Sequence, residues 1–142
     1  MAKRKKISKL AKAKKDITSR YWRNKADAVW SKAVRRDGRC LVCGTTESLQ
    51  AHHLISRWII PLRHELMNGV CLCPKHHKWD RHISGHQSPF GLAVLILREK
   101  PDVWAWLTET FNNWYEIVGA GVGVDYKAAY ERLAGLVGLE HA

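Results

Sequence analysis

The stretch that decides the fold is RCLVCGTTESLQAHHLIS (39–56) together with NGVCLCPKHHK (68–78). All four cysteines of the chain fall between Cys40 and Cys73, and seven of its eight histidines lie between His52 and His86. An even cysteine count can indicate disulfides, but nothing marks the chain as secreted and the cysteine pairs lie beside histidines. Thiolate and imidazole ligands together favour zinc or a similar transition metal.

Two half-sites have the spacing of a zinc knuckle. Two residues separate Cys40 from Cys43, and Gly44 permits the tight turn that follows. Cys73 and His76 repeat this spacing about 30 residues later. We therefore expect one structural Zn²⁺ bound by Cys40, Cys43, Cys73 and His76. A closed set of four ligands leaves no coordination position for a substrate.

The segment around the half-sites predicts a strand, a loop, a second strand and a helix. The residues AHHLI (51–55) are expected in a strand, where neighbouring side chains point to opposite faces, so His52 and His53 should have different tasks. Cys71 is expected in the second, buried strand, and its exchange with Cys73 as a zinc ligand is the alternative. Pro74 indicates that a helix begins there.

Both flanks are predicted to be helical. Apolar residues recur at spacings of three and four between residues 22 and 34, and the tryptophans among them are expected as core anchors rather than as base-stacking platforms. Ser88-Pro89, Pro101-Asp102 and Asp125 each begin a further helix, the second with a broad aromatic face that extends to Tyr115. We expect a basic flexible arm (1–17), an N-terminal helix with the metal-binding core (18–87) and a helical C-terminal extension (88–142).

Charge is distributed unevenly along the chain. The net charge is +11, from 24 Lys and Arg against 13 Asp and Glu, and residues 1–36 hold 14 of the basic side chains but only 2 of the acidic ones. A basic end suits a polyanion, for which nucleic acid is the first candidate. A solubility tail and a nuclear import signal are the alternatives for residues 1–15.

Apolar runs are short throughout the chain. The longest, Leu92–Leu97, has six residues, whereas a membrane helix needs about 20. No apolar signal region follows the basic start. We therefore expect a cytoplasmic protein without a membrane partner.

The order Cys-x2-Cys, His-His, Asn and Cys-x2-His-His in residues 35–82 resembles the HNH endonuclease family. The sequence segments LQAHHLIS and NGVCLCPKHHK are similar to those of the small HNH proteins of bacteriophages. The resemblance implies an α+β fold with a zinc-stapled ββα-metal (HNH) core, flanked by an N-terminal helix and C-terminal helices. It also implies a phage-encoded, metal-dependent endonuclease that hydrolyses phosphodiester bonds of DNA, expected to be double-stranded, leaving 5′-phosphate and 3′-hydroxyl ends.

The resemblance also implies a role for each motif residue. His52 and His77 would bind one catalytic divalent metal (Mg²⁺, Mn²⁺, Ni²⁺ or Zn²⁺), and His53 would be the general base that activates water. Asn68 would hold the loop by hydrogen bonds and help to orient the base, His53. Imidazole suits both tasks because it titrates near neutral pH, and a cation beside the phosphate would offset the charge of the transition state.

The sequence departs from the family pattern at several histidines. His76 stands where many relatives have cysteine, and His52 where others have aspartate. Some relatives carry a further histidine on the helix, four residues after the last ligand; here that position is Arg81, and the next residue, His82, is a further candidate ligand. We expect His64 and His86 to be ordinary loop residues.

Basic residues near the motif and in the N-terminal region are expected to contact DNA phosphates, with solvated charges as the alternative. They are Lys3, Arg4, Lys5, Lys6, Arg20, Arg23, Arg57, Arg63, Lys75, Lys78 and Arg81. Such contacts position a duplex without specifying its sequence. The C-terminal helices could dock on a phage terminase or recombination complex. The alternative function is a non-catalytic, zinc-stabilised DNA-binding factor, or a packaging or recombination accessory factor.

Overall fold

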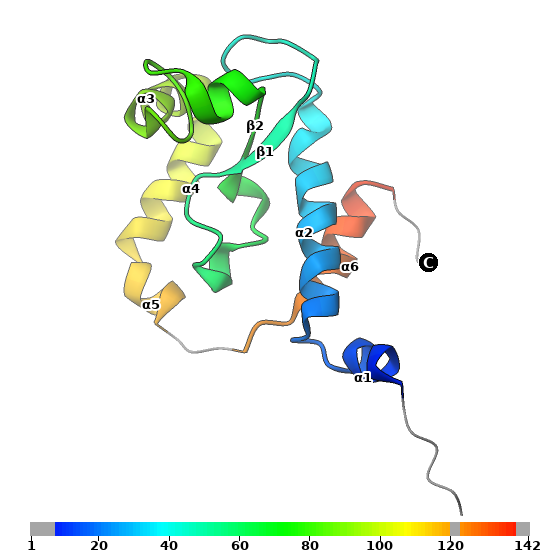
Figure 1. Ribbon diagram of the computed structural model, residues 1–142. Helices are drawn as coiled ribbons and strands as arrows, with labels where there is room; N and C mark the ends of the chain where they lie inside the picture. Colours follow the sequence, from blue (N-terminus) through cyan, green and yellow to red (C-terminus); the bar gives the residue numbers. More distant parts are fainter. Residues whose placement is uncertain (1–7, 120–122, 139–142) are drawn as a thin grey trace, which may run out of the picture.

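A small antiparallel sheet lies between helices in the computed structural model, which describes residues 8–119 and 123–138 (Figure 1). The strands are β1 (Gln50–His53) and β2 (Gly69–Leu72). The helices are α1 (Lys9–Lys15), α2 (Arg20–Val34), α3 (Pro89–Glu99), α4 (Pro101–Asn112), α5 (Trp114–Val118) and α6 (Tyr126–Leu136), with short 3-10 turns at Arg35–Asp37, Ile60–Leu62 and Leu66–Asn68 and a π-helical turn at Lys75–Trp79. The predicted α+β class is confirmed.

The register of the sheet assigns the two central histidines to opposite faces. His52 pairs with Val70, and His53 pairs with Gly69. The face that carries His53 is turned toward α2, where a side chain at position 69 would overlap Trp30 and Val34. Glycine at position 69 therefore lets the helix lie directly on the strand pair.

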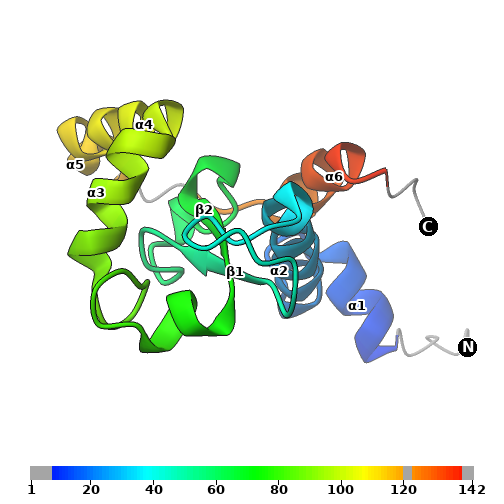
Figure 2. The ribbon, with the colours of Figure 1, turned by 90° about the horizontal axis from the view of Figure 1, so that it is seen from above.

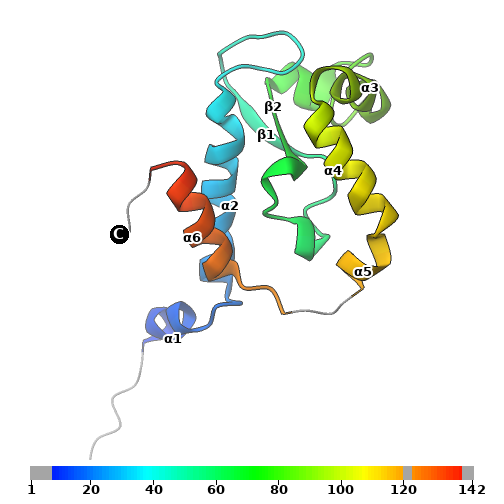
Figure 3. The same cartoon turned by 180° about the vertical axis from the view of Figure 1, so that it is seen from behind.

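Two apolar clusters surround this sheet. The first joins the sheet and the cysteine loops to α3 and α4 through Cys40, Val70, Leu72, Cys73, Leu92, Ile96 and Val103. The second joins α2 to α6 through Val29, Trp30, Ala33, Val34, Leu133 and Ala134. Figures 2 and 3 show α3 and α4 on one side of the sheet, and α2 with α6 on the other. The C-terminal extension therefore completes both clusters of the core.

The predicted flexible arm contains a helix. In α1, the Ser8 hydroxyl accepts a hydrogen bond from Ala11 N at 3.1 Å, which caps the first turn. Two contacts tie this helix to the start of α2: Trp22 Nε1 donates to Lys14 O at 2.9 Å, and Ser19 Oγ donates to Ala13 O at 2.7 Å. The predicted DNA contacts Lys3, Arg4, Lys5 and Lys6 lie outside the described residues.

The predicted helix starts at Pro89, Pro101 and Asp125 are confirmed, and α2, which carries the apolar pattern of residues 22–34, begins after its N-cap Ser19. The aromatic face expected up to Tyr115 is wrong in part, because Asn113 separates α4 from α5 and its Nδ2 donates to Glu109 O at 3.0 Å. Phe111 and Tyr115 remain 60% and 89% exposed. Among the described residues, no helix is long and apolar enough to cross a bilayer.

Candidate metal centres and the cavity beside them

The zinc-knuckle residues lie together. The ligand atoms of Cys40, Cys43, Cys73 and His76 all lie within 4.8 Å of one another. Cys40 Sγ is 3.8 Å from His76 Nδ1, Cys43 Sγ is 3.8 Å from Cys73 Sγ, and Cys73 Sγ is 3.3 Å from His76 Nδ1. Zinc bonds of about 2.3 Å to sulfur and about 2.0 Å to nitrogen give tetrahedral edges of about 3.5–3.8 Å. The four side chains are therefore close enough to hold one metal ion, consistent with a structural zinc.

The backbone of the first half-site shapes this cluster. Gly44 has a φ of 73° and its N–H donates to Cys40 O at 2.9 Å, which closes the knuckle. Leu41 N donates to Cys71 O at 2.9 Å and so ties the knuckle to β2. Cys71 is buried outside the cluster, and burial raises the pKa of its thiol. The structure thus supports Cys73 over Cys71 as the ligand.

Asp80 supports the zinc-knuckle histidine from behind. Its Oδ2 lies 4.0 Å from Nε2 of His76, the ring nitrogen that faces away from the cysteines. Its Oδ1 accepts hydrogen bonds from the backbone N–H groups of Ile83 and His82, at 2.9 and 2.8 Å, and these bonds lower the Asp80 pKa. At this distance the carboxylate is not a hydrogen-bond partner of Nε2, and it supports the ring only electrostatically.

A second cluster contains three histidines. The candidate ligand atoms of His52, His77 and His86 also lie within 4.8 Å of one another, and Nε2 of His86 is 3.3 Å from Nε2 of His77. His77 Nδ1 is 2.6 Å from Gln50 Oε1, a carbonyl oxygen that can only accept. The Nδ1 of His77 therefore carries the proton, and its Nε2 is free to bind a metal.

The chain brings His86 to this cluster by turning back after Asp80, where the predicted helix ends after only five residues. Gly85 N donates to His76 O and His86 N donates to His77 O, both at 3.0 Å. The expectation that His86 is an ordinary loop residue is therefore wrong. His82 lies beyond the end of the helix, is exposed and is not part of the cluster.

Burial and mutual repulsion keep two histidines of this cluster, His52 and His77, uncharged. Burial is the main cause that lowers the pKa of His52, to about 3, followed by its histidine neighbours His77, His86 and His53. Burial, then His86 and Lys78, lower the pKa of His77 to about 4. Both rings are neutral at pH 7, and neutral imidazole is the form that binds metals.

His53 lies on the other face of β1, as expected from the alternation. Its ring stacks on Trp30 of α2, with 3.8 Å between ring centroids and 11° between the planes. Its Nε2 is 2.9 Å from Arg63 O, which can only accept, so Nε2 carries the proton and Nδ1 is left as an acceptor. Burial lowers the His53 pKa, against an opposing effect of the hydrogen bond to Arg63 O.

Asn68 closes the loop that follows β1. It is fully buried, its Oδ1 accepts from Ile55 N at 2.6 Å, and its Nδ2 donates to Ile55 O and Leu62 O, both at 3.0 Å. Leu62 directly precedes Arg63, whose carbonyl oxygen accepts from His53. Asn68 therefore acts on His53 only through this loop.

Arg63 is not exposed to a duplex, which corrects its assignment as a DNA contact. Its side chain is 6% exposed, and its Nε and Nη2 each donate to the Asp27 carboxylate at 2.7 Å. His64 is buried too, and its Nε2 contacts the same carboxylate at 2.7 Å. Burial raises the Asp27 pKa, but the bonds from Arg63 and His64 outweigh it and hold that pKa well below its usual range. The sequence signal for this network is Asp27, the one acidic residue of α2, whose other charged residues are all basic.

The other predicted DNA contacts within the described residues differ in exposure. Arg23 is half-buried. The exposed ones are Arg20, Arg57, Lys75, Lys78 and Arg81. Lys75 also pairs with Asp80 at 3.7 Å.

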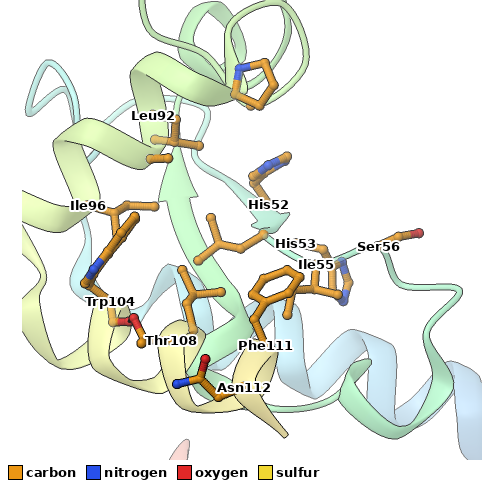
Figure 4. Close-up of a pocket in the computed structure, with 15 residues that line it drawn as sticks. His52, His53, Ile55, Ser56, Leu92, Ile96, Trp104, Thr108, Phe111 and Asn112 are labelled. Carbon is orange, nitrogen blue, oxygen red and sulfur yellow. The ribbon is translucent and has the colours of Figure 1, made fainter. Parts of the chain in front are cut away.

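A cavity of about 640 Å³ opens beside the two central histidines. His52 and His53 both line it, and α3 and α4 form its opposite wall (Figure 4). Although their rings point to different faces of β1, both residues therefore border one space that a substrate could enter.

No family model, curated protein or solved structure matches this chain.

Proposed function

We propose that the protein is a metal-dependent endonuclease of the HNH type that hydrolyses phosphodiester bonds of DNA. The observation that carries the proposal is a cavity lined by two histidines of different character: His52 belongs to a cluster of three histidines that could hold a metal, and His53 has a free Nδ1. A purely structural zinc domain has no need of the second histidine cluster.

His53 is the proposed general base. Its Nε2 proton is held by Arg63 O, so Nδ1 accepts a proton from water as the water oxygen attacks phosphorus and the bond to the 3′ oxygen breaks. Trp30 fixes the ring plane, and Asp27 fixes the position of Arg63. A divalent ion bound at the second cluster would offset the negative charge that develops on the phosphate and the leaving oxygen.

The proposed ligands of this ion are His52, His77 and His86, in place of a two-histidine set with His82. Their donor atoms are imidazole nitrogens, which suit zinc, nickel and related transition metals, whereas Mg²⁺ prefers oxygen. We therefore propose a transition metal rather than Mg²⁺ as the catalytic ion, and zinc at the cysteine cluster.

The proposed substrate fits the charge of the chain. The basic excess of residues 1–36 would hold the phosphates of a duplex, with Arg57, Lys78 and Arg81 nearer to the histidines. A phage origin, and docking of the C-terminal helices on a terminase or recombination complex, remain predictions.

The test is cleavage of supercoiled plasmid by zinc-loaded protein in the presence of Mg²⁺, Mn²⁺, Ni²⁺ or Zn²⁺. His53→Ala should lose at least 100-fold in rate, as removal of a general base does. His82→Ala is the matched control, because it removes an exposed histidine outside the cluster. Plasmid binding without cleavage under any metal would favour the non-catalytic DNA-binding alternative, and equal rates for both variants would refute the role of His53.

A further inference from the structure

Among the described residues that line the cavity beside His52 and His53, there is no Asp, Glu, Lys or Arg. Its far wall is built from Leu92 and Ile96 of α3 and from Trp104 and Phe111 of α4 (Figure 4). Its volume of about 640 Å³ falls within the range of about 300–1,000 Å³ typical of small-molecule sites. Such a space accepts a flat neutral group and disfavours a phosphate.

Phe111 gives this cavity an aromatic surface. It is 60% exposed, unlike the buried apolar residues of α3. Its ring stacks on Trp114, with 5.2 Å between centroids and 7° between planes, so its orientation is fixed before any ligand arrives. A rigid, exposed aromatic ring is a stacking platform for a nucleobase.

Polar groups lie next to this aromatic surface. Asn112 follows Phe111 and lines the same cavity, as do Thr108 and Ser56 (Figure 4). A carboxamide offers a donor and an acceptor side by side, which matches the edge of a base. The cavity thus combines stacking and hydrogen bonding, the two interactions that hold a base outside a helix.

We infer that this cavity receives an unstacked nucleobase of the nucleotide beside the scissile phosphate. The inference rests on the proposed function, because a phosphate at His52 and His53 places its own nucleoside at the mouth of the cavity. A stacked duplex cannot enter a space of this size, whereas a single base can. The substrate class is therefore DNA with an unpaired nucleotide at the cut, such as a mismatch, a bulge or a single strand.

The first experiment compares cleavage of one sequence presented as a paired duplex, as a duplex with one unpaired nucleotide, and as a single strand. The wild type should cut beside the unpaired nucleotide at least tenfold faster than at the same position in the paired duplex, because no base pair has to be broken. Phe111→Ala should reduce the rate at the unpaired site about tenfold, the change expected for one lost stacking contact.

Phe90→Ala is the matched control. Phe90 is 81% exposed on α3 and does not line the cavity, so its loss removes the same side chain elsewhere. It should leave all three rates unchanged. Equal cleavage of paired and unpaired sites, or equal rates for the two variants, would overturn the inference while leaving the proposed nuclease activity intact.

A binding readout separates this inference from the proposed function. The probe is the bulged duplex with 2-aminopurine at the unpaired position, added to His53→Ala and to His53→Ala/Phe111→Ala, so that no cleavage intervenes. Entry of the base into the cavity should change the fluorescence with the first protein, and at least fivefold less with the second. If no protein cleaves DNA, the proposed function fails, and the position of the base beside a scissile phosphate fails with it. Equal fluorescence of the two complexes would overturn entry of a base into the cavity, whether or not the wild type cleaves DNA.

Discussion

Gly85→Ala is predicted to remove the second metal while leaving the first in place. A β-carbon at position 85 would lie 2.5 Å from Cε1 of the His52 ring and 2.7 Å from both ring nitrogens, whereas ordinary contact begins at 3.4 Å. The ring would have to move by about 1 Å. A side chain that binds a metal tolerates only about 0.5 Å of displacement.

The expected loss of metal affinity follows from the free energy needed to hold the His52 ring in its binding position against the added methyl group. Overpacking of this kind costs about 1–3 kcal/mol, and each 1.4 kcal/mol taken from binding is tenfold in affinity. The metal affinity of the second cluster should therefore fall by about 5- to 140-fold. Because the zinc-knuckle cluster does not include His52, its zinc should stay.

The assay is calorimetric titration of the zinc-loaded protein with Ni²⁺, with zinc content measured by mass spectrometry before and after. Gly135→Ala is the control, because position 135 lies in α6 and an added β-carbon there meets nothing within 4 Å. Wild-type Ni²⁺ affinity in Gly85→Ala, or loss of zinc from it, would refute the reasoning.

Three further predictions concern stability. Cys40→Ser should lose about one equivalent of zinc and lower the melting temperature, because structural zinc contributes to folding; an intact, zinc-replete variant would remove the knuckle assignment. Asn68→Ala should cost about 3 kcal/mol in urea unfolding, because three buried hydrogen bonds lose their partner; a cost below about 1 kcal/mol would contradict this. Asp27→Asn should cost about 2 kcal/mol at pH 7, less than a fully buried pair because the carboxylate is 35% exposed. Because the folded state lowers the Asp27 pKa, this stabilisation is present above about pH 4 and is lost as the pH falls further, so the melting temperatures of wild type and Asp27→Asn should converge in acid. A constant difference down to pH 2 would exclude the ion pair as its source.

The spacing of residues along the chain predicts well those parts of the site whose residues are close together in the sequence. Cys40 with Cys43 and Cys73 with His76 are pairs whose partners are close in the chain, so a ligand spacing is enough to recognise them. The placement of the His52 and His53 side chains on opposite faces of the sheet also follows from the alternation of side chains along one strand.

The missed features depend on contacts between distant segments. His86 reaches the second cluster because the chain reverses after Asp80, whereas an expected longer helix placed His82 there. Arg63 looked like a surface cation because its partner, Asp27, lies 36 residues earlier in α2. Spacing and periodicity describe single elements and cannot specify such pairings.

In the proposed two-metal protein, the adjacency of His76 and His77 would set an order for metal loading. One residue belongs to the cysteine cluster and the next to the histidine cluster, and their two carbonyl groups accept the hydrogen bonds that position Gly85 and His86. We expect that His77 and His86 take up their places only once zinc has organised this turn. Occupancy of the second centre should therefore depend on prior occupancy of the first, which would make zinc supply in the cell a checkpoint for maturation of the protein.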